Sequence, residues 1–163
     1  MKSNVLEKLV KKCIVVIALI TGITSLFLSA SSLNSAQEKG RPQISSQVVF
    51  LYYSDFSKAV EFYEQTMEFK PTTNLGWVRI YKVTENSFVG IVDESKGFHR
   101  TSQDKPVMLS WIADDVDGWF DYLKKKGVKI LTEPKDNKET GIRGFIFSDP
   151  GGYTLEFFKW LNQ

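Results

Sequence analysis

Cysteine and histidine are almost missing from this chain, which has one of each, Cys13 and His99. One cysteine excludes a disulfide within the chain and a metal site built from several thiolates. The sequence also contains no nucleophile triad, no phosphate-binding loop and no zinc-spaced cluster. A stable fold must therefore come from an apolar core, for which 13% aromatic residues supply ample material.

Charged residues are absent from residues 13–30, which follow a basic head, residues 1–12, with four lysines and one glutamate. A small, polar stretch comes next, and this order is typical of an export signal. We assign residues 1–36 to it. The alternative is a membrane anchor, because the apolar run approaches the ~20 residues that span a bilayer. The protein is therefore expected to be exported (periplasmic or secreted), or anchored by its N-terminus if residues 13–30 are retained.

An excess of positive charge is also missing once the leader is set aside. The whole chain carries a net charge of +2, and removal of residues 1–36 leaves about −1. Proteins that bind nucleic acid usually show a basic patch or stripe. No nucleic-acid partner is expected.

Two segments of the chain match each other at an offset of 60 residues, "VVFLYYSDFSKAVEFYEQTMEFKP" from Val48 and "MLSWIADDVDGWFDYLKKKGVKIL" from Met108. Each starts with an apolar run of strand length and reaches an aspartate, Asp55 or Asp115. An aspartate there favours a helix start, because its side-chain oxygen accepts a free N–H of the first turn. Helical spacing of apolar residues follows in both segments, and Gly127 suits the end of the second helix.

Three short strand-like runs separated by turn residues follow each helix. They cover residues 69–72, 76–83 and 87–93 in the first half, and 128–133, 142–148 and 153–160 in the second. This pattern predicts an α+β domain made of tandem βαβββ modules. The predicted parts are a flexible arm (37–46) and a domain (47–160) that divides into module one (47–94), a connector (95–106) and module two (107–160).

Three motifs in this order are similar to those of a known family: "DFSKAVEFY" from Asp55, "ADDVDGWFDYLKKKGV" from Ala113 and "SDPGGYTLEFF" from Ser148. The chain resembles the vicinal-oxygen-chelate superfamily, which includes glyoxalase I, bleomycin- and fosfomycin-resistance proteins and extradiol dioxygenases. The resemblance implies paired βαβββ modules forming a curved mixed sheet around a shared cavity. It also implies a homodimer, in which modules are sometimes exchanged between chains.

The resemblance further implies a metal site with one ligand on the first strand of each module, seven residues before the capping aspartate, and a glutamate on the last strand. These positions hold Val48, Met108 and Glu156. A fourth family position falls near Gly90–Ile91. A valine cannot bind a metal, and a thioether is a poor ligand for hard divalent ions. We expect no cofactor, with a divalent metal held by Glu156 and unusual partners such as Gln47, Asp93 or His99 as the alternative.

The face of each strand that would line the cavity follows from the alternation of side chains. The predicted ligand pocket contains mainly apolar side chains with a few polar ones: Phe50, Tyr52, Met108, Ser110, Thr154, Glu156 and Phe158. Val48 and Ile112 share these faces. Such a composition is typical of a small-molecule pocket, although the same side chains are also consistent with ordinary core.

Glu156 lies between apolar neighbours and has several interpretations. It is a hook for a cationic or hydrogen-bond-donating ligand, a metal ligand or catalytic base, or a solvent-facing strand residue. Arg79 or Arg143 is a possible ion-pair partner, although solvated arginines are commoner. In the connector, His99 or Arg100 either closes over the cavity or is solvated.

The aromatic residues outside the predicted pocket are expected to form core or dimer contacts. They are Trp77, Tyr81, Trp111 and Trp119.

The sequence thus predicts an exported protein that binds a small molecule between its modules without the family's standard metal site. The alternatives are a metal-dependent lyase, isomerase or dioxygenase that uses Glu156, and a non-catalytic interaction or structural domain.

Overall fold

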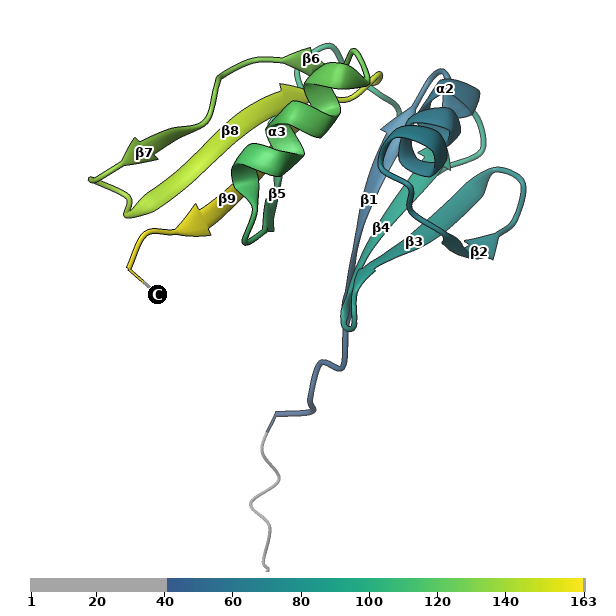
Figure 1. Cartoon of the computed structure of the whole chain (residues 1–163). Helices are drawn as coiled ribbons and strands as arrows, with labels where there is room; N and C mark the ends of the chain where they lie inside the picture. Colours follow the sequence, from purple (N-terminus) through teal and green to yellow (C-terminus); the bar gives the residue numbers. More distant parts are fainter. Residues whose placement is uncertain (1–40, 163) are drawn as a thin grey trace, which may run out of the picture. The chain divides into compact units, whose positions relative to one another are not determined.

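Residues 41–162 are the part of the chain that the computed structural model describes (Figure 1). The predicted signal or anchor, residues 1–36, lies outside them. Within the described range, no helix is long and apolar enough to cross a membrane. Residues 41–46 are exposed and form no helix or strand. The following elements belong to one compact unit that starts at Ile44.

Module one forms the first sheet. Its elements are β1 (Gln47–Tyr53), α2 (Phe56–Glu61), the π-helical turn η1 (Phe62–Thr66), β2 (Pro71–Asn74), β3 (Val78–Thr84) and β4 (Ser87–Asp93). The strand order is β1-β4-β3-β2, with β1 parallel to β4 and the other pairs antiparallel. The helical segment connects β1 to the far edge of the sheet, and two antiparallel turns return the chain to β1 (Figure 1).

Module two repeats this arrangement. Its elements are β5 (Met108–Ile112), α3 (Val116–Lys125), β6 (Lys129–Ile130), β7 (Lys135–Asn137), β8 (Ile142–Ser148) and β9 (Thr154–Trp160). The order is β5-β9-β8-β6, and β5 is parallel to β9. The α+β fold with two βαβββ modules and curved mixed sheets is therefore confirmed.

Module two also contains a strand that the sequence pattern did not predict. β7 pairs with β8 inside a stretch that we interpreted as turn, residues 133–141. The Asn137 side chain accepts bonds from the N–H groups of Glu139 and Thr140, at 3.0 and 3.3 Å. Gly141 follows with a φ of 69°. This tight turn folds a polar segment back onto β8. Backbone pairing with β8 therefore forms a strand that lacks the alternating apolar residues by which strands are usually predicted.

Both helices begin at the predicted aspartates. Asp55 Oδ1 accepts a bond from Lys58 N at 3.0 Å, and Asp115 Oδ1 accepts one from Gly118 N at 2.9 Å. Gly127 follows the end of the second helix and has a φ of 75°. Glu68 follows the end of the first helical segment and is a non-glycine residue with a φ of 57°. The left-handed backbone conformation that commonly ends a helix is thus present in both modules.

The core lies on the face of each sheet that carries the helix. Alternate residues of the strands are buried there: Leu51 and Tyr53 on β1, Trp111 on β5, Phe145 and Phe147 on β8, and Leu155 and Phe157 on β9. Tyr81 and Trp111 belong to this core, as predicted, and Trp119 packs against it. The opposite faces of the strands carry the predicted pocket residues.

The two modules are joined through the turn between β8 and β9. The hydroxyl of Tyr153 in module two donates to the carbonyl of Tyr52 and accepts from its N–H, at 3.1 and 3.0 Å. The Asp149 carboxylate accepts a bond from the Tyr53 hydroxyl at 2.5 Å. The "DPGG" turn of module two is therefore held to β1 of module one.

Candidate ligand-binding site

The pairing of the strands defines which positions of the two modules correspond. β1 and β4 place Phe50 beside Gly90, and β5 and β9 place Ser110 beside Glu156. The duplication aligns Phe50 with Ser110, so Gly90 corresponds to Glu156. The register that the sequence left open is thereby settled, and the fourth family ligand position is Gly90.

Glu156 lies at the centre of the uncovered face of the second sheet. Its neighbours in the sheet are Ser110 on β5 and Ile146 on β8. The Ser110 hydroxyl donates to Glu156 Oε2 at 2.6 Å. Glu156 is partly exposed. The serine orients the carboxylate but does not neutralise it, so the carboxylate remains suited to a cation or a hydrogen-bond donor.

Neither arginine considered as a partner of Glu156 contacts it. Arg79 pairs with Glu64 instead. The guanidinium of Arg143 donates to Asp117 at 2.6 and 2.9 Å and to Asp136 at 2.9 Å, and hydrogen bonding to Asp117 raises its pKa above the usual value. Pairing with Glu156 is therefore wrong for both. For Arg143 the reason is strand alternation. The neighbouring Gly144 lies beside Phe158 on the face of the sheet that carries Glu156, so Arg143 lies on the opposite face.

The apolar side chains at the predicted positions of β1 and β5 are open to solvent. The exposed fractions are 40% for Val48, 43% for Phe50, 49% for Met108 and 65% for Ile112. The interpretation of these four as ordinary core is therefore wrong. Ser110 is exposed as well, whereas Tyr52, Thr154 and Phe158 are half-buried.

The corresponding position in module one is covered by an aromatic ring. A Cβ atom added at Gly90 would lie 2.4 Å from Cδ1 of Phe50. The ring therefore occupies the space that a side chain at position 90 would need. The first sheet presents a flat aromatic surface where the second presents a carboxylate.

Phe50 and Tyr52 also line a groove of about 560 Å³ with the connector. The connector contributes residues 99–106 apart from Gln103, and Val107 and Tyr153 contribute from module two. The other five predicted pocket residues do not line this groove. His99 packs edge-on against Tyr52, with 5.2 Å between ring centroids. His99 and Arg100 are both exposed, so His99 contacts the first strand while it remains accessible to solvent.

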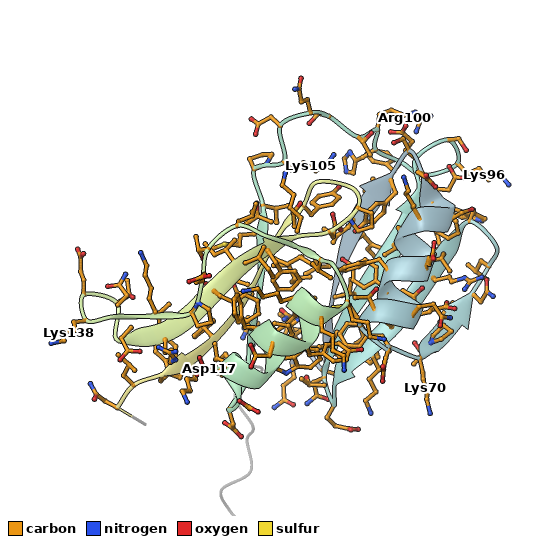
Figure 2. All side chains as sticks on the ribbon, turned by 45° about the horizontal axis from the view of Figure 1, so that its top comes forward. Lys70, Lys96, Arg100, Lys105, Asp117 and Lys138 are labelled. Atoms are coloured by element: carbon orange, nitrogen blue, oxygen red, sulfur yellow. The ribbon has the colours of Figure 1, made fainter. Side chains whose placement is uncertain are left out.

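The connector holds its own shape through local bonds. Arg100, labelled with Lys105 in Figure 2, donates from Nη1 to the carbonyl oxygens of Glu94 and Gly97 at 2.5 and 2.9 Å. Thr101 donates to the Glu94 carboxylate at 2.6 Å through both its N–H and its hydroxyl, which lowers the pKa of that carboxyl. Arg100 therefore supports the connector backbone.

The residues present do not fit the metal site of the family. The four corresponding positions are Val48, Gly90, Met108 and Glu156, and Glu156 alone has an oxygen donor. Stable sites need three or four donors. Within residues 41–162, no three His, Cys, Asp or Glu side chains are placed to hold an ion.

Comparison with known proteins identifies the fold family. Residues 45–157 match the sequence model of the Glyoxalase/Bleomycin resistance protein/Dioxygenase superfamily. The chain belongs to this superfamily. A similar protein is "Uncharacterized protein YraH" of Bacillus subtilis (strain 168), which is 32% identical over 122 residues, covering 68% of this chain and 94% of the relative.

Solved structures of the glyoxalase superfamily share the fold at low identity. A glyoxalase/bleomycin resistance protein/dioxygenase from Nocardioides has a TM-score of 0.63 and 17% identity, covering 86% of this chain and 94% of that one. A lactoylglutathione lyase from Agrobacterium tumefaciens has a TM-score of 0.59 and 17% identity, covering 73% and 96%. These similarities show the architecture alone.

Sequence reasoning missed a buried carboxylate in the glyoxalase-superfamily motif "SDPGG". Asp149 is 6% exposed and accepts bonds from the Tyr53 and Tyr63 hydroxyls, at 2.5 and 3.4 Å. The N–H groups of Gly151 and Tyr153 donate to its other oxygen, at 2.9 and 2.8 Å. Burial raises its pKa above the usual value. The signal in the sequence was an aspartate before a glycine pair, which we interpreted as a turn residue only.

Proposed function

We propose that this protein binds a small, partly apolar molecule against the uncovered strand faces, and that Glu156 anchors it without a metal ion. The observation that carries the proposal is the Ser110–Glu156 pair, an oriented carboxylate beside β5, whose apolar residues Met108 and Ile112 are exposed. Pockets for small molecules combine an apolar lining with a few placed polar groups. A carboxylate only accepts hydrogen bonds when ionised, so the ligand must supply a cation or a donor.

The loss of donors at the metal positions supports binding over metal-dependent chemistry. Val48 and Met108 stand where the family places a ligand on each first strand, and Phe50 fills the space beside Gly90. Aromatic and aliphatic groups at these places suit contact with an apolar ligand. The remaining polar group, the Glu156 carboxylate, would then orient the ligand.

Substitution of Glu156 by glutamine should weaken the binding of cationic fragments and leave the fold intact. Glutamine keeps the size of the side chain but removes the charge, and hydrogen bonds to charged groups contribute about 1.5–3 kcal/mol. Affinity should therefore fall roughly 10- to 100-fold. Ligand-observed NMR with a library of small amines and neutral analogues measures this. The exposed turn variant Glu139→Gln is the control and should bind like the parent.

Metal content provides the opposing test. Protein incubated with Zn²⁺, Ni²⁺ or Mn²⁺ and then dialysed should retain far less than one ion per chain by elemental analysis. Near-stoichiometric metal that disappears in Glu156→Ala would contradict the metal-free proposal and favour an enzyme. Amine fragments that bind the Glu156→Gln variant as well as the parent would remove Glu156 from the ligand site.

We further propose that a second copy of the chain covers the exposed strand faces and completes the pocket. Apolar side chains that are about half exposed favour association. Both modules present such a face, so a symmetric pair of chains can bury module one of each copy against module two of the other. Two equivalent pockets would then form, each with one Glu156.

Substitution of Phe50 by glutamate should convert this dimer to monomer. A charge at a buried apolar contact costs several kcal/mol unless it is paired, so the dissociation constant should rise by about a hundredfold or more. Sedimentation velocity over a concentration series measures it. Phe98→Glu is the matched control, because Phe98 is 89% exposed on the connector. A parent protein that sediments as a monomer at high micromolar concentration contradicts the dimer.

Export is part of the same proposal. Residues 1–36 would direct the domain out of the cytoplasm and be removed, or residues 13–30 would remain as an anchor. Mass spectrometry of protein recovered from the native cell envelope distinguishes these outcomes. Full-length protein in the cytoplasmic fraction would contradict both.

A further inference from the structure

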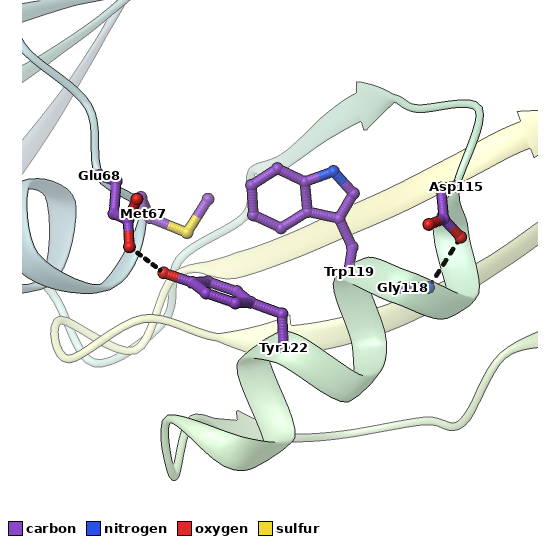
Figure 3. Close-up of a pocket in the computed structure, with 6 residues that line it drawn as sticks. All are labelled: Met67, Glu68, Asp115, Gly118, Trp119 and Tyr122. Atoms are coloured by element: carbon purple, nitrogen blue, oxygen red, sulfur yellow. Dashed lines mark hydrogen bonds between the residues drawn. The ribbon is translucent and has the colours of Figure 1, made fainter.

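A second hollow lies on the helix side of the domain, away from Glu156. It has a volume of about 280 Å³ and is lined by Met67, Glu68, Asp115, Gly118, Trp119 and Tyr122. Figure 3 shows Trp119 and Tyr122 rising from α3, with Met67 and Glu68 facing them from the end of η1. We call it the helix-side groove. Its volume is just below the usual range for ligand pockets, so it suits a small ligand.

The lining of this groove combines aromatic rings with carboxylates and contains no cationic side chain. Trp119 and Tyr122 meet edge to face, with ring centroids 5.7 Å apart. Glu68 approaches from one module and Asp115 from the other. Aromatic faces attract cations through their quadrupole, tryptophan most strongly, and carboxylates add charge attraction. The lining therefore complements a positively charged ligand with apolar substituents.

A lysine at the edge of the groove already makes this type of contact. Lys126 Nζ lies 5.3 Å from the centroid of the Tyr122 ring and 3.8 Å from Glu68 Oε1. Both side chains of this ion pair are well exposed, and exposed pairs contribute at most about 1 kcal/mol. Lys126 thus shows that an ammonium group is attracted to Tyr122 and Glu68. The contact is weak enough for a bound cation to displace the lysine.

Glu68 occupies the left-handed backbone position after the helical segment of module one, and a glycine occupies the position of this type in module two. The φ of Glu68 is 57°, and Gly127, which follows the second helix, has a φ of 75°. A side chain in this conformation is disfavoured relative to glycine. The Glu68 carboxylate accepts a bond from the Tyr122 hydroxyl at 2.8 Å. The carboxylate is thus placed at the groove at a cost to the backbone.

We propose that the helix-side groove binds a small organic cation, an alkylated or quaternary ammonium whose charged head lies against Trp119 and Tyr122. Glu68 and Asp115 flank the head and supply the compensating charge. The bound cation competes with Lys126 for Glu68 and Tyr122. This site is separate from the pocket proposed around Glu156 and does not depend on it.

Choline and its neutral isostere 3,3-dimethylbutan-1-ol test the proposal on the purified domain. The readout is the indole N–H signal of Trp119 in ¹H–¹⁵N NMR spectra during titration. Choline should produce a saturable shift with millimolar affinity, and the neutral isostere should bind about fivefold more weakly, as expected for an exposed cation–π contact. Equal responses to the two compounds, or no response of Trp119 to choline, would overturn the proposal.

Three variants separate a binding role from a structural one. The double variant Glu68→Gln, Asp115→Asn should remove the preference for choline, while asparagine preserves the helix cap. Lys126→Met should strengthen choline binding about two- to fivefold, because the competing ammonium is gone. Asp55→Asn changes the equivalent cap of α2, outside the groove, and should leave binding unchanged. Weakening of choline binding in Lys126→Met, or an equal loss in Asp55→Asn, contradicts the proposed site.

Discussion

Substitution of Phe157 by alanine should lower the free energy of unfolding by about 3–5 kcal/mol, the usual cost of removing a buried phenylalanine. Phe157 is 4% exposed. Its ring stacks on Trp119 at 4.4 Å between centroids and on Phe147 at 5.7 Å, and it lies 5.3 Å from Trp111. Its removal would leave a cavity between α3 and the inner strands β8 and β9. The rings of Trp111, Trp119 and Phe147 would each lose their contact with Phe157.

The neighbouring residue provides the control for this prediction. Phe158 lies on the opposite face of β9 and is half-buried, so Phe158→Ala should cost about 1 kcal/mol or less. Urea unfolding followed by far-ultraviolet circular dichroism measures both variants. The result bears on function, because it distinguishes the core face of the strand from the face that carries Glu156. Equal costs for the two variants would mean that Phe158 is also core, which leaves little room for a ligand.

Replacement of Asp149 by alanine should cost about 3 kcal/mol or more, the second large effect that we expect. The two tyrosine hydroxyls and two N–H groups that now bond to the carboxylate would lose their acceptor, and each unsatisfied buried group costs about 1–3 kcal/mol. The network connects β1 and η1 to the turn before β9. Its loss should loosen the contact between the modules as well as the turn.

Paired variants identify the source of this loss. In Tyr53→Phe, Tyr63→Phe the rings remain and the hydroxyls are removed, so the cost should be clearly smaller than that of Asp149→Ala. Amide hydrogen exchange of Gly151 and Tyr153 reports on the turn, and both amides should exchange faster in Asp149→Ala. Unchanged exchange at these amides would contradict the proposed role of the carboxylate in holding the turn.

The same carboxylate predicts a dependence of stability on pH. Burial raises the pKa of Asp149 in the folded protein, so folding favours its protonated form. The stability that this group contributes is complete below its unfolded pKa, near 4, and is lost as pH rises through the folded pKa. Asp149→Asn cannot titrate. The difference in unfolding free energy, parent minus variant, should therefore fall as pH increases above about 4, measured by urea unfolding at several pH values.

Several features of this protein were readable before any coordinates. The duplication places Asp55 and Asp115 at equivalent positions, and both cap a helix. Alternation along β9 separated Glu156 from the core residues on either side of it. Capping and alternation act over a few residues, so local sequence is enough to predict them.

Other features depended on contacts between distant segments. The partners of Arg143 lie 7 and 26 residues away, and the two hydroxyls bonded to Asp149 come from 86 and 96 residues away. β7 exists because a turn brings a polar segment to the edge of β8. A sequence pattern carries no record of such pairings, because each side chain is compatible with many partners until the backbone is placed.

The candidate site shows the same division. The residue types alone established that Val48 and Met108 are unsuited to hold the metal ion of the family. Whether a side chain has a suitable donor atom depends on its type and not on its position in the fold. The remaining features emerged from the register of strands whose paired residues are 40 to 46 positions apart. This register shows that Gly90 corresponds to Glu156. It also places Ser110 beside the Glu156 carboxylate and Phe50 beside Gly90. Strand pairing depends on the packing of the whole domain, and it placed one carboxylate beside a strand that carries exposed apolar side chains.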